Sequence, residues 1–83
     1  MQDIERQVIE IIAKKQKLDP ATVTVDSTFE QLGLDSLDAA DLLFTVEDTF
    51  GIIVPDGAAQ AMRTVGGVAD AIRRLQAERD EAS

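Results

Sequence analysis

The hydrophobic and polar positions along the chain repeat with the period of α-helices. A first helix is predicted over residues 3–17, where apolar residues recur at three- and four-residue intervals at Ile4, Val8, Ile11 and Ile12. The run Leu18-Asp19-Pro20 ends it, because the residue before a proline is forced out of helical geometry. A last helix is predicted from residue 65, capped by Thr64, with an apolar stripe of Val65, Val68, Ile72 and Leu75.

The second predicted helix begins at the run Asp35-Ser36-Leu37-Asp38 and ends at Phe50. Asp35 is a suitable N-cap, Asp38 resembles the acidic half of a capping box, and Gly51 allows a left-handed stop. We expect one face to be buried, made of Ala39, Leu42, Leu43, Val46 and Phe50. A second face mixes apolar side chains with acids at Leu37, Ala40, Asp41, Phe44, Glu47 and Asp48.

The connections between these helices are irregular in pattern. Residues 18–35 contain valines alternating with threonines but no partner strand, and we expect apolar residues to pin the segment to the core at Phe29, Leu32 and Leu34. Residues 52–55 are predicted to be an extended apolar link packed across the core. Asp56 is predicted to cap a short turn of helix that continues through Ala61 and ends near Met62.

The expected fold is therefore all-α, a small bundle of three main helices and one short helix with a long ordered loop between helices one and two. We expect a single domain over residues 1–76, followed by a polar C-terminal tail at 77–83 that frays. The chain opens straight into an acidic amphipathic segment rather than a signal peptide, and no stretch approaches the ~18 apolar residues of a membrane span. We expect a cytoplasmic monomer without membrane insertion.

The composition excludes most catalytic chemistry. The chain has no cysteine and therefore no disulfide, thiolate nucleophile or Cys-type zinc site. It also has no histidine, which removes Ser-His catalysis, His-ligated metals and the commonest general base near neutral pH. Nothing matches a calcium-loop motif. We expect neither an enzyme with catalytic residues of its own nor a metal site.

The net charge of −8 is distributed unevenly. Residues 18–62 contain no lysine or arginine but hold nine acids, at Asp19, Asp26, Glu30, Asp35, Asp38, Asp41, Glu47, Asp48 and Asp56. Such a segment repels nucleic acid and anionic membranes and attracts basic protein surfaces. The alternative is that the acids simply solvate a small protein.

Ser36 is the residue best placed for chemistry. The first turn of a helix presents free backbone N–H groups and the positive end of the helix dipole, which favour a phosphate ester. No histidine or lysine stands near Ser36 in the sequence, so its hydroxyl is poised for modification by another enzyme rather than for attack on its own. The alternative is an ordinary serine at a helix start.

The residues around Ser36 resemble the acyl carrier protein family. The family's central D-S-L triplet is met by Asp35-Ser36-Leu37 after Gly33-Leu34. The resemblance extends through the acidic helix that ends at Phe50-Gly51 and through the run Ile53-Val54-Pro55-Asp56. It therefore covers almost the whole chain, from the first helix and long loop to the closing helix.

This resemblance implies a covalent cofactor and a set of protein partners. In the family, the serine that matches Ser36 carries 4′-phosphopantetheine, donated from coenzyme A by a separate transferase, and the arm's thiol holds acyl groups as thioesters. Asp35 and Leu37 flank that attachment site. The acids of the second helix match those that meet basic docking patches on the transferase, on acyl-transferring enzymes and on ketosynthase-type enzymes. The implied partner-binding residues are Asp35, Leu37, Asp38, Asp41, Phe44, Glu47 and Asp48.

Some positions depart from the family pattern or leave alternatives open. The turn Gly57-Ala58-Ala59-Gln60 lacks the acids typical of fatty-acid carriers, and Arg63 stands where a neutral residue is usual. Together with the apolar Ile52-Ile53 pair, these departures favour a specialised lipid or polyketide pathway over general fatty-acid synthesis. Other hypotheses are an aminoacyl or peptidyl carrier and an unmodified acidic helical adaptor. Phe44 could also be a core aromatic instead of a partner contact.

Overall fold

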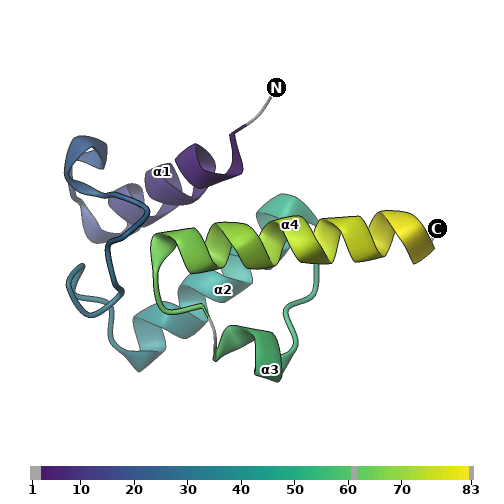
Figure 1. The fold of residues 1–83 in the computed structure, drawn as a ribbon. Coiled ribbons are helices and arrows are strands. Elements are labelled where there is room, and N and C mark those ends of the chain that lie inside the picture. The colour runs from purple at the N-terminus through teal and green to yellow at the C-terminus, as the bar shows by residue number, and fades with distance from the viewer. Residues whose placement is uncertain (1–2, 61, 83) are drawn as a thin grey trace.

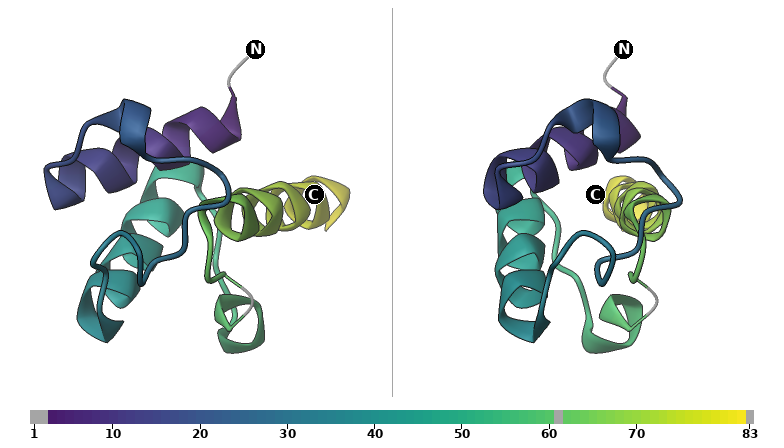
Figure 2. Two further views of the ribbon diagram at one scale, coloured as in Figure 1. Left: turned by 60° about the vertical axis from the view of Figure 1, so that its left-hand side comes forward. Right: turned by 90° about the vertical axis from the view of Figure 1, so that its left-hand side faces the viewer.

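Three long helices and two short ones make up the chain in this computed structural model, which describes residues 3–60 and 62–82. Helix α1 spans Ile4–Gln16, α2 spans Ser36–Phe50 and α4 spans Val65–Ala82. The short elements are a 3-10 turn, η1 (Pro20–Thr22), and α3 (Asp56–Ala59). Helix α1 packs mainly against α4, and α3 lies at the end of the bundle away from α1 (Figures 1 and 2). The predicted all-α fold is confirmed.

The predicted stripes supply the core. Each long helix contributes side chains with no measurable exposure, among them Val8, Ile12, Leu42, Val46, Val68 and Ile72. The long loop adds Val23 and Leu34, and the link after α2 adds Ile52. Within the described residues the core holds no charged or polar side chain. Nor does any described helix combine the length and the hydropathy that crossing a membrane requires.

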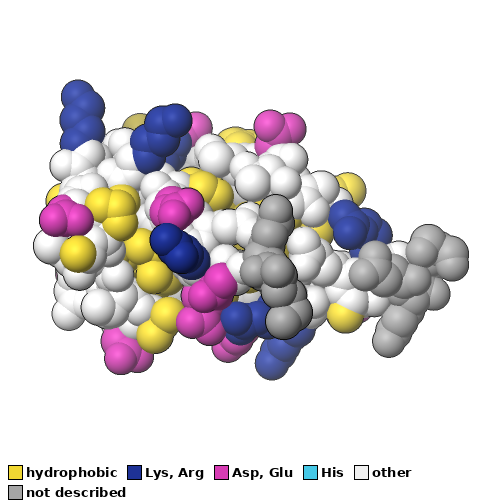
Figure 3. Space-filling view, turned by 90° about the horizontal axis from the view of Figure 1, so that it is seen from above, with side chains coloured by type: hydrophobic (Ala, Val, Ile, Leu, Met, Phe, Trp, Pro, Cys, Tyr) yellow, Lys and Arg dark blue, Asp and Glu magenta, His cyan; other side chains and the backbone are white. Residues whose placement is uncertain are grey.

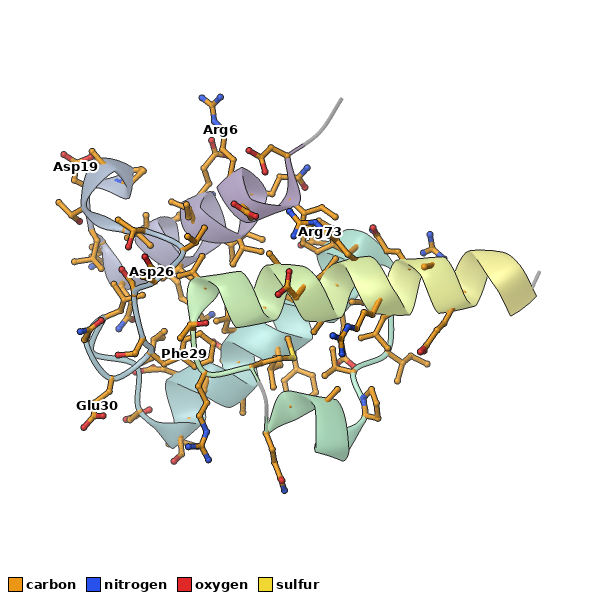
Figure 4. All side chains as sticks on the ribbon, viewed as in Figure 1. Arg6, Asp19, Asp26, Phe29, Glu30 and Arg73 are labelled. Atoms are coloured by element: carbon orange, nitrogen blue, oxygen red, sulfur yellow. The ribbon has the colours of Figure 1, made fainter. Side chains whose placement is uncertain are left out.

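The long loop between α1 and α2 is ordered by hydrogen bonds to the start of α4. The Phe29 N–H donates to the Arg63 carbonyl at 3.0 Å, and the Gly66 N–H donates to the Val25 carbonyl at 2.9 Å. A side chain at position 66 would stand 3.1 Å from that same Val25 oxygen, so the glycine permits the close approach. The expectation that this loop is pinned to the core is confirmed, with Phe29 pointing toward the helices (Figure 4).

Helix α4 extends beyond the predicted start of the polar tail. It remains helical through Ala82, whereas the domain boundary after Gln76 and the fraying of the polar tail stay predictions. A tertiary contact holds the helix there, because Arg79 donates to the carbonyls of Phe50 and Gly51 at 3.2 and 2.9 Å. Those carbonyls end α2, where a cation is favourable for the helix dipole.

The start of α3 also differs from the prediction. Pro55 occupies the N-cap position and its carbonyl accepts hydrogen bonds from the N–H groups of Ala58 and Ala59, so Asp56 is the first helical residue and not the cap. A proline suits this place because it ends the extended link with its fixed φ. The helix ends at Ala59, earlier than predicted, and Ala61 lies outside the described residues.

Helices α1 and α4 are joined by a salt bridge. Arg73 on α4 binds Glu5 on α1 at 3.0 Å and Asp70 on its own helix at 3.1 Å (Figure 4). The hydrogen bond to Glu5 raises the pKa of the Arg73 guanidinium above its ordinary value. Seen from above, basic and acidic side chains are interspersed over this face (Figure 3).

Candidate functional site

The first turn of α2 is held by a reciprocal pair of aspartates. The Asp35 carboxylate accepts a hydrogen bond from the Asp38 N–H at 2.8 Å, and the Asp38 carboxylate accepts one from the Asp35 N–H at 3.3 Å. This is the predicted capping box, and it satisfies two N–H groups that would otherwise lack a helical partner. The box fixes the position of Ser36, the first residue of the helix.

Ser36 lies exposed at this helix start. Among the described residues, no group forms a hydrogen bond with its hydroxyl. The positive end of the α2 dipole lies at the same point and favours an anionic group there. The chain holds no histidine, the commonest general base near neutral pH, to assist the hydroxyl.

An open pocket of about 350 Å³ adjoins Ser36. The long loop contributes four of its lining residues, the start of α2 contributes three, and the connection before α4 contributes Arg63; the full lining is Thr28, Phe29, Glu30, Leu34, Asp35, Ser36, Ala39 and Arg63. Arg63 is its basic residue, whereas Glu30 and Asp35 are its acids. Arg63 is unusual already in the sequence, but its place beside Ser36 could not be predicted, because the two residues come from distant segments.

The exposed face of α2 carries most of the predicted partner-binding residues. Leu37 is 80% exposed and Phe44 is 68% exposed, so the alternative interpretation of Phe44 as a core aromatic is wrong. Asp35, Asp41 and Asp48 are exposed on the same helix, while Asp38 is half-buried in the capping box. Apolar and acidic side chains therefore alternate on a surface that a partner can reach.

Besides Asp35 and Asp38 of the capping box, two more of the predicted partner-binding acids have partners within the chain. Asp41 forms an ion pair of 2.6 Å with Lys15 of α1. One oxygen of the half-buried Glu47 carboxylate accepts a hydrogen bond from the Val54 N–H at 2.7 Å. Glu47 thereby fixes the link after α2 to the end of that helix, a role that was not predicted from the sequence.

The link itself presents an apolar residue that sequence reasoning placed inside. Ile52 is buried and Val54 is half-buried, but Ile53 is 83% exposed. An extended segment points successive side chains to opposite sides, so the core can take only Ile52 and Val54. The expectation that the whole link packs across the core is therefore wrong for Ile53. The alternation of side chains in an extended segment could have predicted this exposure.

The site suits an attached anionic group. Among residues 3–60 and 62–82, no cluster of three or more carboxylate, histidine or cysteine side chains could hold a metal. The exposed hydroxyl of Ser36, the helix dipole and the open pocket with its arginine instead fit an anionic ester on the serine. Fold and site together define a small helical carrier domain.

Comparisons with known proteins agree with this class. The family model described as "Phosphopantetheine attachment site" matches residues 6–72, and the chain belongs to this family. It is 42% identical over 74 residues to the acyl carrier protein of Rickettsia typhi, covering 88% of this chain and 86% of that one. The mitochondrial acyl carrier protein of Dictyostelium discoideum is 39% identical over 72 residues, which cover 87% of this chain and 60% of that one.

A solved structure shows the same architecture. The acyl carrier protein of Thermotoga maritima superposes with a TM-score of 0.76 at 30% sequence identity, covering 94% of this chain and 98% of that one. The chain is thus an acyl carrier protein by family, and its cofactor is 4′-phosphopantetheine. This confirms the carrier role and the cofactor that the D-S-L resemblance implied.

Proposed function

We propose that Ser36 is the residue that carries 4′-phosphopantetheine and that the arm holds acyl groups as thioesters. The observation that carries this proposal is the exposed Ser36 hydroxyl, set at a capped helix start beside an open pocket. In loading, the Ser36 oxygen would form a bond to the phosphorus of coenzyme A that bears the pantetheine. The pyrophosphate P–O bond to that phosphorus breaks, adenosine 3′,5′-bisphosphate leaves, and the serine proton passes to a base on the transferase. The arm then supplies the thiol that this cysteine-free chain lacks.

The proposed partners approach the exposed face of α2. We define this docking face as Asp35, Leu37, Phe44 and Asp48, to which the exposed Ile53 is added from the link. Lysine and arginine side chains of a transferase, an acyltransferase or a ketosynthase-type enzyme would meet the acids, with apolar contact at Leu37 and Phe44. Asp38, Asp41 and Glu47 support the face through their contacts within the chain.

The chain then acts as the carrier of the acyl group, and the partner enzymes catalyse the reactions. It presents the acyl thioester to each enzyme in turn, as a monomer in the cytoplasm, within fatty-acid synthesis or a dedicated lipid or polyketide pathway. The neutral turn Gly57–Gln60 and the arginine at position 63 support the dedicated pathway.

The test is loading of the purified protein with coenzyme A and a broad-specificity phosphopantetheinyl transferase, followed by intact mass. Wild type gains the mass of one arm, Ser36→Ala gains nothing, and the matched Ser83→Ala control gains the same mass as wild type. Circular dichroism of Ser36→Ala checks that the fold is unchanged. A wild-type protein that gains no mass would instead favour the unmodified adaptor.

A further inference from the structure

We propose that Arg63 is a positioning residue that binds the phosphodiester of the arm on Ser36 and holds the arm over the adjoining pocket. This inference rests on the proposed attachment at Ser36. Arg63 and Ser36 line the same open pocket, although they are far apart in the sequence. A phosphodiester on Ser36 therefore forms at the rim of a pocket that contains one arginine.

Backbone hydrogen bonds hold Arg63 near the start of α2. Its carbonyl accepts a hydrogen bond from the Phe29 N–H at 3.0 Å, and the Phe29 carbonyl accepts one from the Leu34 N–H at 2.9 Å. Leu34 lies two residues before Ser36. A bridge between Thr28 and Thr64 reinforces the same contact from the neighbouring residues. Two backbone hydrogen bonds thus connect Arg63 to the segment that leads into α2.

Once the arm is attached, the pocket holds an additional negative charge that Arg63 can neutralise. Loading adds a negative charge at Ser36, beside Asp35 and within the same pocket as Glu30, so the new anion meets two carboxylates of like sign. None of the four ion pairs found among the described residues includes Arg63. Lys15, by contrast, is already bound to Asp41 of α2. Arg63 is therefore available to neutralise the phosphodiester.

Arginine suits this role for geometric reasons. Its planar guanidinium donates two parallel hydrogen bonds to phosphate oxygens, which a lysine ammonium cannot match. The apolar lining next to it, from Phe29, Leu34 and Ala39, provides a surface against which the aliphatic part of the arm can lie. Arg63 would in this way limit the directions the arm takes as it leaves Ser36.

The experiment is nuclear magnetic resonance of the unloaded and loaded protein. The ³¹P resonance of the arm and the Arg63 Nε–Hε resonance are followed in wild type, Arg63→Gln, Arg63→Lys and the matched control Arg74→Gln. Arg74 is also exposed, but it lines a different groove, between the link, α3 and α4. Both single changes to glutamine remove one positive charge.

We expect loading to shift the Arg63 Nε–Hε resonance of wild type and to leave that of Arg74 in place. In Arg63→Gln the ³¹P line should move and narrow relative to wild type, and it should lose most of its response to ~1 M NaCl. Arg63→Lys should recover part of the wild-type behaviour, and Arg74→Gln all of it. A guanidinium resonance that loading leaves unchanged would overturn the proposal.

Two further outcomes separate this inference from others. If Arg63→Gln lowers the melting temperature of the unloaded protein as much as that of the loaded one, Arg63 acts on Glu30 and Asp35 instead, and the proposal is wrong. If loading succeeds on Ser36 while the ³¹P line is the same in all variants, only the role of Arg63 fails. If no arm is attached to Ser36, the proposed function fails as well.

Discussion

The middle of the chain, residues 18–62, differs sharply from the segments on either side of it. The middle has nine acids and no base, whereas the rest of the sequence has seven acids and eight bases. All four large apolar side chains that are exposed among the described residues also lie in the middle, at Leu18, Leu37, Phe44 and Ile53. In α1 and α4 the large apolar residues are buried or half-buried, and three ion pairs join charged residues of these two helices.

This difference shows how a small domain separates support from recognition. The outer helices pair several of their charges with one another, as in the contacts of Arg73 with Glu5 and Asp70. Among the described residues, one ion pair involves an acid of the middle segment. It joins Asp41 of α2 to Lys15 of α1. The middle segment is therefore left with a negative, partly apolar surface around Ser36, which matches the needs of a protein that must be recognised by several enzymes.

The largest effect should come from comparing two apolar residues of α2. Leu42 is fully buried, so Leu42→Ala should lower the free energy of unfolding by about 3 kcal/mol. Phe44→Ala should change it by less than about 0.5 kcal/mol but slow loading by the transferase about tenfold, because an exposed aromatic is a typical interface anchor. Urea unfolding and loading kinetics measure both. A stability loss as large at Phe44 as at Leu42 would contradict the assigned faces.

A smaller effect should distinguish the adjacent acids Glu47 and Asp48. Glu47→Ala removes the charged acceptor of the Val54 N–H and should cost about 1–2 kcal/mol of stability. Asp48→Ala should cost almost nothing in stability, within about 0.5 kcal/mol, but should slow loading. Glu47→Gln, which keeps an oxygen acceptor, is the control and should retain most of the stability. Equal behaviour of the two alanine variants would remove the distinction between a structural and a docking acid.

The smallest effect should appear with salt, and with opposite signs for stability and recognition. Salt screens the repulsion among the acids of the middle segment, so we expect the melting temperature to rise by about 2–4 °C. The same screening should slow loading several-fold, because attraction to basic partners weakens. Asp48→Asn should reduce the salt dependence of loading, while Glu78→Gln on α4 should not. A loading rate that salt leaves unchanged would argue against charge-guided docking.

The features that the sequence predicted are those set by local chemistry. The three long helices, the Asp35–Asp38 capping box and the stop at Gly51 follow from neighbouring residues alone. Gly33 and Gly51 both adopt positive φ, as a tight path and a helix stop require. Ser36 could be chosen as the candidate because its surroundings match a local motif.

The features that the sequence did not predict depend on contacts between distant segments. The helical extension of α4 needs the carbonyls at the end of α2 as acceptors for Arg79. The internal role of Glu47 needs the link to turn back toward its own helix. The position of Arg63 beside Ser36 needs the long loop to bond to the start of α4. No spacing in the sequence reports any of these distances.

The attachment of the arm to Ser36 can be tested directly by locating it within a peptide. The sequence has three serines, and trypsin releases residues 18–63 as one peptide because cleavage sites stand at Lys17 and Arg63 but nowhere between them. Fragmentation of this peptide from the loaded wild-type protein distinguishes Ser27 from Ser36. We expect every fragment that carries the added mass to include Ser36 and none to require Ser27. An arm found on Ser27 or on Ser83 would contradict the account.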